Sequence, residues 1–527
     1  MEKSRLGLKR WFVSRWRKPL DGMLVAAIMS IYTLVAFHVP LFSAVVAATE
    51  GGWHMALILC SFIILLLVAN FMIYGIMLYA MRTVGRVLIS LFMLGNAIAL
   101  YFINSYEVLL TREMMGNIFN TQYSEASSYF SIGAVLYTLL LGVMPSVWLL
   151  CRKVNYGKMR RFAVSMLCSI LGIITLALVN MGSVLWIDRN APVIGSLILP
   201  WSYVVNSVRY ANQQCAAGRE AVLLPAVDSI SASRDVVVLV IGESARSANF
   251  SLYGYERITN PLLESDGVTI FEASASATYT TAGVEAILSH APSDELYESL
   301  PSYLSRAGVY VSWRTTNWGE PSLKVDSYLK AQDIKDRYAD ADMSYDGILL
   351  AGLDEEIAAS EADKLLIVLH TSTSHGPTYY KKYPSEFEVF SPVCTTVEMS
   401  KADHESLVNA YDNTILYTDY LLHSVIEVLR GVEDRRCAMI YVSDHGESLG
   451  EGGLYMHGMP LALAPSEQID IPFIVWTSED VSYKSFDAVG HYHVFHSVLG
   501  FMGVSTPIYN SSNNIFMTVG TENDVVK

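Results

Sequence analysis

Three places in the chain carry carboxylate and imidazole side chains in a pattern that suits a metal centre. Glu243, His375 and the pair Asp444-His445 each follow a separate apolar run, and His457 comes shortly after the last of them. Carboxylate oxygens and imidazole nitrogens suit zinc or manganese, and the lack of cysteine among them argues against a structural zinc cluster. A single glutamate after a strand is often a helix cap or a solvated residue, but the whole set on separate strands predicts a metal site.

The apolar runs before these residues predict buried β-strands. They are continuous rather than alternating, which is typical of a sheet covered on both faces. A long helical pattern lies over Asp403–Arg430, with Asp403 as a plausible N-cap and Gly431 just after its end. Alternating strands and helices predict an α/β fold with a largely parallel sheet, in which ligands bind beyond the carboxyl ends of the strands. The predicted strands are Val236–Ile241, Val309–Trp313, Leu365–Leu369, Met439–Val442 and Phe473–Trp476.

The first third of the chain differs in composition from the rest. The 527 residues are 52% hydrophobic with a mean hydropathy of +0.33, and nearly all of this excess lies before residue 190. Residues 1–161 carry 15 Lys and Arg against 6 Asp and Glu, whereas the remainder carries 21 against 45. A basic, apolar part followed by an acidic part indicates a membrane module and a soluble domain. Because an acidic domain repels phosphate backbones, nucleic acid is not an expected partner.

Five apolar stretches are long enough to cross a bilayer core of about 30 Å. The segment before the first stretch and the four loops that follow carry 7, 0, 2, 1 and 5 Lys and Arg. This alternation predicts a cytoplasmic N-terminus and places everything after about residue 187 outside the cytoplasmic membrane. His38 and Pro40 predict a kink in the first stretch. The stretches are Gly22–Ala47, Met55–Ala80, Val87–Tyr101, Ile132–Leu150 and Phe162–Ile187.

These boundaries predict three parts. We expect a transmembrane domain over residues 1–187 and an outer domain over residues 234–527. Residues 188–233 show no sustained pattern and are expected to form a connector. Their prolines and aromatic residues suit a chain that lies along the membrane interface.

Four longer motifs carry a resemblance that covers essentially the whole chain. They read IGESARSANFSLYGYERITNP (residues 241–261), SHGPTYYKKYP (374–384), LVNAYDNTILYTDY (407–420) and SDHGESLGEGGLYMHGMP (443–460). With these motifs the chain resembles the lipid A phosphoethanolamine transferases, which include the mobile colistin-resistance enzymes and belong to the alkaline-phosphatase/sulfatase superfamily. The resemblance implies a multi-pass protein of the bacterial inner membrane with a periplasmic catalytic domain. It also implies transfer of phosphoethanolamine from phosphatidylethanolamine to lipid A or another lipopolysaccharide or envelope-glycan acceptor, and hence polymyxin resistance.

The resemblance also implies a set of site residues. By similarity, Glu243, Asp444 and His445 bind a catalytic zinc ion together with a threonine nucleophile. The family has this threonine in a stretch that reads C-G-T-x-T-A, and the matching stretch here reads ATYTTA (residues 277–282). Aligning the final T-A predicts Thr281 as nucleophile and metal ligand, with Thr280 as the alternative. The cysteine and the glycine of the family's stretch are absent here.

A two-step transfer follows from this similarity. The threonine hydroxyl, whose alkoxide zinc stabilises, attacks the phosphorus of the donor lipid and releases diacylglycerol, and the phosphothreonine then serves the acceptor. The family places His375 and His457 close to the metal, where they can bind a second zinc ion or the substrate phosphate. It places His404, Lys324 and Asn317 in the substrate pocket.

Two other functions stay open on the sequence alone. A glycerophosphate transferase similar to lipoteichoic-acid synthases would share the spans and the threonine but prefer manganese, and the SHGPTYY and YDNTILYTD segments favour the first function over it. A non-catalytic sensor of envelope lipids is suggested by the altered threonine stretch. Bound zinc in stoichiometric amount and a phosphorylated threonine would exclude that sensor.

The charge alternation predicts the side of the membrane on which the outer domain lies. A periplasm-specific reporter fused after Asp188 should be active, because an odd number of spans separates it from a cytoplasmic N-terminus. The same reporter fused after Arg86, in a loop predicted to be cytoplasmic, should be inactive. Activity of a cytoplasm-specific reporter after Asp188 would contradict the topology.

Overall fold

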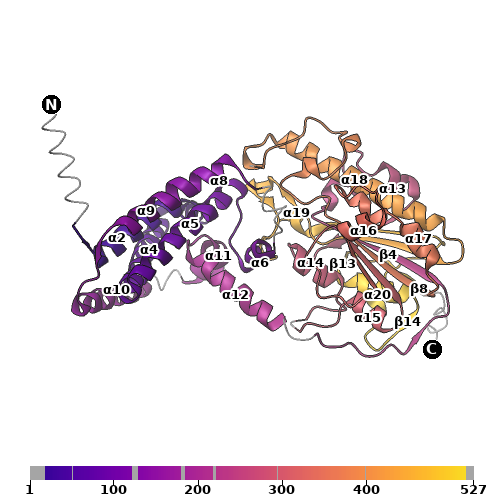
Figure 1. Cartoon of the computed structure of the whole chain (residues 1–527), viewed down its shortest axis with the longest axis horizontal. Helices are drawn as coiled ribbons and strands as arrows, with labels where there is room; N and C mark the ends of the chain where they lie inside the picture. The colour runs from indigo at the N-terminus through magenta and orange to yellow at the C-terminus, as the bar shows by residue number, and fades with distance from the viewer. Residues whose placement is uncertain are drawn as a thin grey trace. The chain divides into compact units, whose positions relative to one another are not determined.

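The computed structural model describes residues 18–49, 51–120, 129–179, 184–217, 221–293, 295–397 and 399–517. The chain divides into two compact units (Figure 1). The first comprises Met1–Met115 with Phe130–Arg209, and the second comprises Gly116–Tyr129 with Tyr210–Lys527.

The first unit contains the apolar helices. Four of them are long and apolar enough to cross a membrane: Met55–Met81, Thr83–Tyr106, Ile132–Cys151 and Met159–Val179. A bent pair, Gly22–Phe37 with Val39–Ala47, passes the same test, and together these agree with the five predicted stretches. The described helices up to residue 217, with the π-helical segment η1, are α2 (Gly22–Phe37), α3 (Val39–Ala47), α4 (Gly52–Met81), α5 (Thr83–Tyr106), α6 (Arg112–Asn120), α8 (Ile132–Tyr137), η1 (Thr138–Val143), α9 (Met144–Cys151), α10 (Met159–Val179), α11 (Val184–Ser196) and α12 (Trp201–Ala217). The boundary between the two units falls within α6 and within α12.

The predicted kink is present between α2 and α3. The two helices meet at 56° on either side of His38, and Pro40 lies in the first turn of α3. Proline suits that position because its missing N–H would be unpaired in a first turn anyway. His38 Nδ1 lies 3.0 Å from the carbonyl oxygen of Thr33 in the last turn of α2, which gives the buried ring a partner at the break.

Helix α12 and most of α11 lie in residues 188–233, for which the sequence predicts a connector and leaves open a helix along the membrane interface, whereas residues 184–187 of α11 belong to the predicted fifth stretch. Asn190–Ser196 and Trp201–Asn212 form a second bent pair, at 105°, that is apolar enough to be a candidate span. The sequence pattern conceals α12 because Asn206 is buried and donates to the carbonyl oxygen of Leu110 at 2.6 Å, whereas Val208 is 56% exposed. A polar buried face inverts the periodicity on which helix prediction relies.

The second unit is built on an eight-stranded sheet in the order β13-β5-β12-β9-β4-β8-β6-β7. All neighbours are parallel except β12, which runs antiparallel to both β5 and β9. This confirms the largely parallel sheet and each predicted strand. In sequence order the strands are β4 (Asp235–Gly242), β5 (Thr269–Ser274), β6 (Tyr310–Thr315), β7 (Ser327–Lys330), β8 (Lys364–His370), β9 (Arg436–Ser443), β12 (Asp470–Thr477) and β13 (Val489–Gly490).

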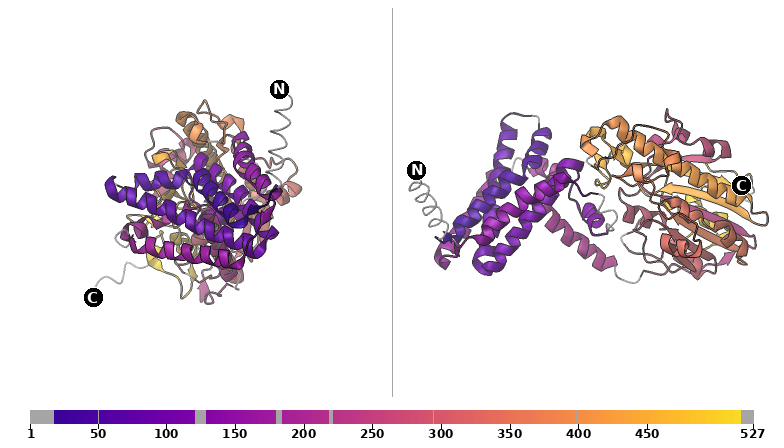
Figure 2. Two further views of the ribbon diagram at one scale, coloured as in Figure 1. Left: turned by 90° about the vertical axis from the view of Figure 1, so that its left-hand side faces the viewer. Right: turned by 45° about the horizontal axis from the view of Figure 1, so that its top comes forward.

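Helices cover both faces of this sheet, which explains why its central strands are apolar throughout. Every residue of β4 and β8 is buried. One face carries α13 (Pro261–Asp266), α17 (Leu353–Ala359) and α18 (His404–Arg430), and the other carries α14 (Thr280–Ile287), α15 (Leu300–Arg306) and α20 (Tyr492–Phe501) (Figure 1). The long helix α18 runs across its face of the sheet in the right-hand view of Figure 2.

The boundaries of α18 follow from its caps. The Asp403 side chain accepts a hydrogen bond from the Ser406 N–H at 3.0 Å, as an N-cap does, and Gly431 is the C-cap. Both were predicted from the sequence. The two caps therefore fix where α18 begins and ends, and the buried residues of this helix include Tyr411 and Asp412.

Candidate metal centre

The ligand residues come together because two parallel strands end side by side. Gly242 at the end of β4 pairs with Ser443 at the end of β9, so that Glu243 and Asp444 emerge next to each other. Glu243 is 2% exposed and both Asp444 and His445 are fully buried. His445 Nε2 lies 3.4 Å from Glu243 Oε1 and 3.4 Å from Asp444 Oδ2. The carboxyl edge of the sheet thus gathers the three predicted metal ligands.

Hydrogen bonds hold these ligands so that lone pairs face one point. Asp444 Oδ1 accepts from the backbone N–H of Ser244 at 3.1 Å and of His445 at 2.7 Å. Asp444 Oδ2 is left without a hydrogen-bond partner among the described residues, although it is buried. His445 Nδ1 lies 2.9 Å from the Gly446 carbonyl oxygen and must donate to it, which leaves the Nε2 lone pair of the neutral ring free. Outer hydrogen bonds of this kind orient metal ligands.

The buried carboxylates of Glu243 and Asp444 place excess negative charge in the cluster. Burial and the Glu243 charge raise the pKa of Asp444 well above its usual range. Burial lowers the pKa of His445, but Asp444 and Glu243 outweigh it and raise that pKa to about 10. A proton on His445 thus supplies one positive charge between two buried carboxylates. A divalent ion at the orphaned oxygen supplies more charge and displaces that proton, so the donor set fits a metal.

The threonine stretch enters the cluster at the N-terminus of α14. Thr280 is the first residue of this helix and is 1% exposed. Its Oγ1 donates to Glu243 Oε2 at 3.2 Å and lies 3.5 Å from His445 Nε2. Thr281 follows it and is partly buried, with no such contact among the described residues. The structure therefore brings Thr280, the alternative, to the ligand group instead of Thr281.

Gly283 explains how α14 approaches so closely. A Cβ at this position would lie 2.3 Å from the carbonyl oxygen of Asp444 and 3.0 Å from its Cβ. Only glycine permits such contact between the first turn of the helix and the end of β9. The partial positive charge of the helix N-terminus is thereby aimed at the position where an anionic substrate would bind.

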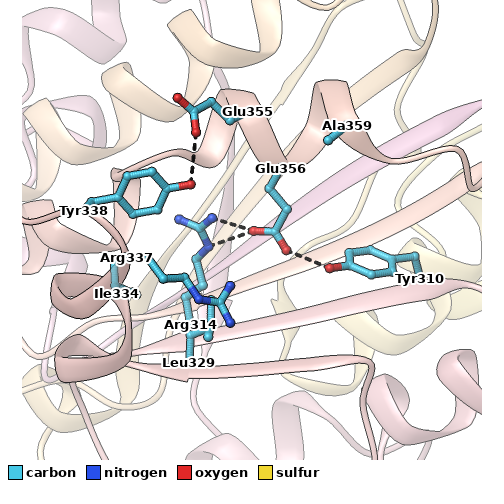
Figure 3. A pocket seen from close by; sticks show the side chains of 9 residues that line it. All are labelled: Tyr310, Arg314, Leu329, Ile334, Arg337, Tyr338, Glu355, Glu356 and Ala359. Carbon is cyan, nitrogen blue, oxygen red and sulfur yellow. Dashed lines mark hydrogen bonds and ion pairs between the residues drawn. The ribbon is translucent and has the colours of Figure 1, made fainter.

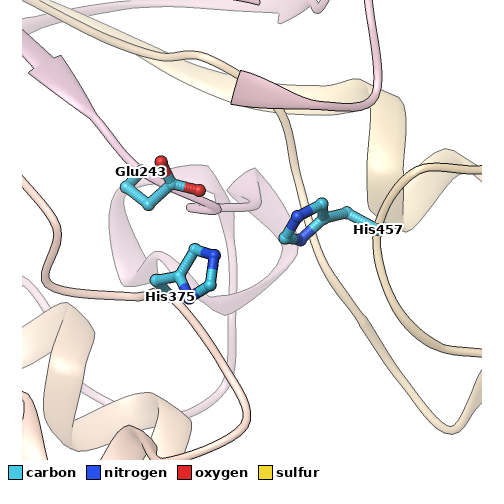
Figure 4. A group of neighbouring side chains, drawn as sticks. All are labelled: Glu243, His375 and His457. Carbon is cyan, nitrogen blue, oxygen red and sulfur yellow. The ribbon is translucent and has the colours of Figure 1, made fainter. Parts of the chain in front are cut away.

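His375 and His457 lie beside the same glutamate. One ligand atom from each of them and from Glu243 all lie within 4.8 Å of one another, and the rings face the carboxylate in Figure 4. His457 Nδ1 lies 2.7 Å from Glu447 Oε2, and the Tyr379 hydroxyl donates to Glu447 Oε1 at 2.5 Å. Glu447 has no assigned role in the sequence prediction, although its position two residues after His445 was a usable signal.

Among the described residues, one of the three other predicted pocket residues contacts the ligand group and two do not. Asn317, in the loop after β6, donates from Nδ2 to Glu243 Oε2 at 2.7 Å and so belongs to the cluster. Lys324 and His404 are exposed, and in the described part of the chain neither side chain contacts the ligand group. Their role in binding substrate stays a prediction.

A second acidic group offers an instructive contrast. Asp266, His423 and Glu427 also have ligand atoms within 4.8 Å of one another. Here Asp266 Oδ1 is paired with Arg430 Nη1 at 2.9 Å and Oδ2 with His423 Nδ1 at 2.9 Å. Because both carboxylate oxygens are already paired, this group needs no added cation.

A separate cavity of about 280 Å³ lies between β6, β7, α16 (Ala331–Arg337) and α17 (Figure 3). Its buried cation, Arg314, binds Glu356 Oε2 and the carbonyl oxygens of Leu349 and Ala351. The Tyr310 hydroxyl donates to the other oxygen of Glu356 at 3.1 Å. Arg314 and Glu356 therefore neutralise each other at this cavity.

Comparison with known proteins assigns the chain to a family. Residues 235–504 match the family model described as Sulfatase, and residues 66–215 match that of Phosphoethanolamine transferase EptA/EptB. Phosphoethanolamine transferase EptA of Helicobacter pylori is 37% identical over 504 residues, which cover 93% of this chain and 95% of that one. The chain belongs to the lipid A phosphoethanolamine transferase family.

Other members of the family are similar along most of their length. Phosphatidylethanolamine transferase Mcr-1 of Escherichia coli is 30% identical over 88% of this chain and 91% of its own. The solved structure of the integral membrane lipooligosaccharide phosphoethanolamine transferase A from Neisseria meningitidis matches with a TM-score of 0.84 and 28% identity. It covers 95% of this chain and 99% of that one. The chain described here is therefore a transferase, and it is a multi-pass membrane protein with a soluble C-terminal domain.

Because Asp444 Oδ2 is buried and accepts no hydrogen bond among the described residues, we expect Asp444 to be required for metal binding. Purified protein should contain about one tightly held divalent ion per chain, measured by elemental analysis after dialysis. Asp444→Ala should lose this ion, because the remaining ligands cannot complete the site. Asp266→Ala is the matched control and should keep it. A variant Asp444→Ala with full metal content would exclude this centre.

Proposed function

We propose that this enzyme transfers phosphoethanolamine from phosphatidylethanolamine to lipid A or another lipopolysaccharide acceptor through a covalent intermediate on Thr280. The observation that carries the proposal is the Thr280 hydroxyl, 3.2 Å from Glu243 Oε2 and at the N-terminus of α14. A nucleophile needs a proton acceptor within hydrogen-bond reach and an anion site beside it. The names of relatives support the donor, through phosphatidylethanolamine transferase Mcr-1, and the acceptor class, through the lipooligosaccharide phosphoethanolamine transferase A of Neisseria meningitidis.

The choice of Thr280 replaces the sequence prediction of Thr281. Neighbouring residues in the first turn of a helix point in different directions, so only one of them can reach the ligands. The contacts of Thr280 with Glu243 and His445 support its assignment. The alignment of the final T-A favours Thr281, but two adjacent threonines cannot be distinguished by residue type, so the contacts decide our choice.

Zinc is the ion that we propose for this centre. Glu243, Asp444, His445 and the Thr280 hydroxyl would hold it, and His375 with His457 offer nitrogen ligands close by. Two carboxylates, one imidazole and one oxygen suit a four-coordinate zinc site. When bound, zinc lowers the pKa of the threonine hydroxyl and offsets charge on the phosphoryl oxygens.

The chain's own groups account for the movement of protons and bonds. Glu243 Oε2 accepts the proton of Thr280 as Oγ1 forms its bond to phosphorus. The bond from phosphorus to the diacylglycerol oxygen breaks, and that oxygen takes a proton from water. In the second step Glu243 returns its proton to Thr280 Oγ1. Burial and the nearby His445 lower the pKa of His457, so its ring is neutral and can accept a proton. In the second step the acceptor group attacks the phosphothreonine, and we propose that His457 takes the proton which that group loses. Glu447 holds that ring in place.

The proposed membrane topology suits a reaction between lipids. We propose that residues 1–187 lie in the inner membrane with a cytoplasmic N-terminus, that residues 188–233 connect them, and that residues 234–527 face the periplasm. The alternation of 7, 0, 2, 1 and 5 basic residues supports this orientation. Confinement to the bilayer raises the effective concentration of a lipid donor and a lipid acceptor.

The nucleophile can be identified by trapping the intermediate. Thr280→Ala should abolish both turnover and the covalent adduct formed with phosphatidylethanolamine, because no other hydroxyl contacts Glu243 in this stretch. Thr281→Ala is the matched control and should retain transfer within about tenfold, since it changes only the packing of the same turn. Peptide mapping should find added phosphoethanolamine on Thr280.

Three results would contradict the proposal in different ways. An adduct on Thr281 would return the nucleophile to the sequence prediction. An adduct of glycerophosphate mass would indicate a glycerophosphate transferase. The absence of any adduct and of any turnover in metal-loaded protein would indicate a non-catalytic sensor.

A further inference from the structure

One buried carboxylate near the site lies outside every motif and outside the ligand set. Asp346 is the first residue of the 3-10 helix η5 (Asp346–Leu350) and is 3% exposed. It lies between β7 and β8 in the sequence, in a segment with no recognisable pattern. A carboxylate buried to this extent must be stabilised by several donors.

Four hydrogen bonds satisfy Asp346, and all of them come from two loops. Oδ1 accepts from the Thr316 hydroxyl at 2.5 Å and from the Ser372 hydroxyl at 3.1 Å. Oδ2 accepts from the Ser372 N–H at 2.7 Å and from the Thr373 hydroxyl. Thr316 belongs to the loop after β6, and Ser372 and Thr373 belong to the loop after β8. Asp346 therefore joins the two loops at the carboxyl edge of the sheet.

Each of these loops carries a residue of the site. Asn317 directly follows Thr316 and donates from Nδ2 to Glu243 Oε2 at 2.7 Å and to the Thr371 carbonyl oxygen at 2.8 Å. His375 lies two residues after Thr373 and belongs to the group formed with Glu243. The carboxylate of Asp346 thus lies behind two side chains that flank the same glutamate.

The loop after β6 also covers the threonine. Gly319 has a φ of +100°, and a Cβ on it would lie 3.3 Å from the methyl groups of Thr280 and Thr281. Glu320, the next residue, accepts from the Tyr328 hydroxyl on β7. The loop is thereby fixed at both ends, by Asp346 at Thr316 and by Tyr328 at Glu320, with Asn317 held between them.

We infer that Asp346 is a positioning residue for the transfer reaction, which keeps Asn317 and His375 in fixed positions around Glu243. The inference rests on the proposed function for its kinetic consequence. Displacing a ligand or its hydrogen-bond partner by about 1 Å can lower a rate on the order of 100-fold. Loss of Asp346 should therefore act on catalysis beyond any effect on folding.

If Asp346 only stabilised the fold, replacing it would affect turnover no more than replacing any other buried carboxylate of this sheet. Asp235 is a matched case, fully buried at the amino end of β4 and therefore at the opposite end of the strand from Glu243. It is bound by Lys364 Nζ, by Arg436 Nε at 2.8 Å and by the Ser233 hydroxyl at 2.9 Å. Asp235→Asn should reduce stability without selectively reducing turnover.

The test compares Asp346→Asn with Asp235→Asn in the full-length, metal-loaded protein. In either orientation of the Asn amide, an NH2 group that cannot accept replaces one carboxylate oxygen, so two of the four groups that donate to Asp346 lose their acceptor and the other two keep only an uncharged one. With phosphatidylethanolamine in mixed micelles as the probe, kcat of Asp346→Asn should fall about 30- to 100-fold with KM changed less than about threefold. Amide hydrogen exchange should accelerate at least about tenfold in both loops, over residues 316–320 and 371–375, in this variant alone.

Each outcome decides the inference. Wild-type kcat in Asp346→Asn, unchanged exchange in either loop, or an equal loss of kcat in Asp235→Asn would overturn it. If Asp346→Asn does not fold, Thr316→Val removes one donor without changing shape and should give a smaller loss of kcat with faster exchange in the first loop, and wild-type behaviour of that variant would overturn the inference. If the wild-type protein transfers nothing from phosphatidylethanolamine, the proposed function fails, whereas the exchange data still show whether Asp346 holds both loops.

Discussion

Two carboxylates that share one buried space determine the organisation of the site. Glu243 and Asp444 are brought together because β4 and β9 are parallel neighbours that end in register. Ionised carboxylates at such a distance in a buried site repel each other and are stable only with a cation between or beside them. His445 alone offers one proton, and Asp444 Oδ2, which accepts no hydrogen bond from the described residues, marks where further positive charge is required. The sheet topology thus accounts for the gathering of the candidate metal ligands.

The surrounding elements all approach this one point. Helix α14 brings Thr280 to Glu243, and it can do so because Gly283 lies against Asp444 without a side chain. The loops after β6 and β8 bring Asn317 and His375, and Asp346 connects them. In the second unit, loops from several elements thus surround one pair of carboxylates.

The sequence predicts the parts of this fold whose signals are local. Continuous apolar runs revealed the central strands, and Asp403 with Gly431 revealed the ends of α18, since each signal lies within a few residues. Helix α12 was missed because Asn206 faces inward and Val208 outward. The sequence left Thr280 as the alternative to Thr281, because adjacent threonines differ only in their three-dimensional contacts, and those contacts favour Thr280. Asp346 left no signal, because its hydrogen-bond donors come from loops distant in sequence.

The most direct measurement is anomalous diffraction at the zinc absorption edge, on crystals of protein purified without chelator. A single strong peak should lie among Asp444 Oδ2, Glu243, His445 Nε2 and Thr280 Oγ1. An absence of any peak there, with a proton bridging His445 and the carboxylates, would contradict a metal-centred site. A peak at Asp266 and His423 instead would contradict it as well, because that group is already neutralised by Arg430.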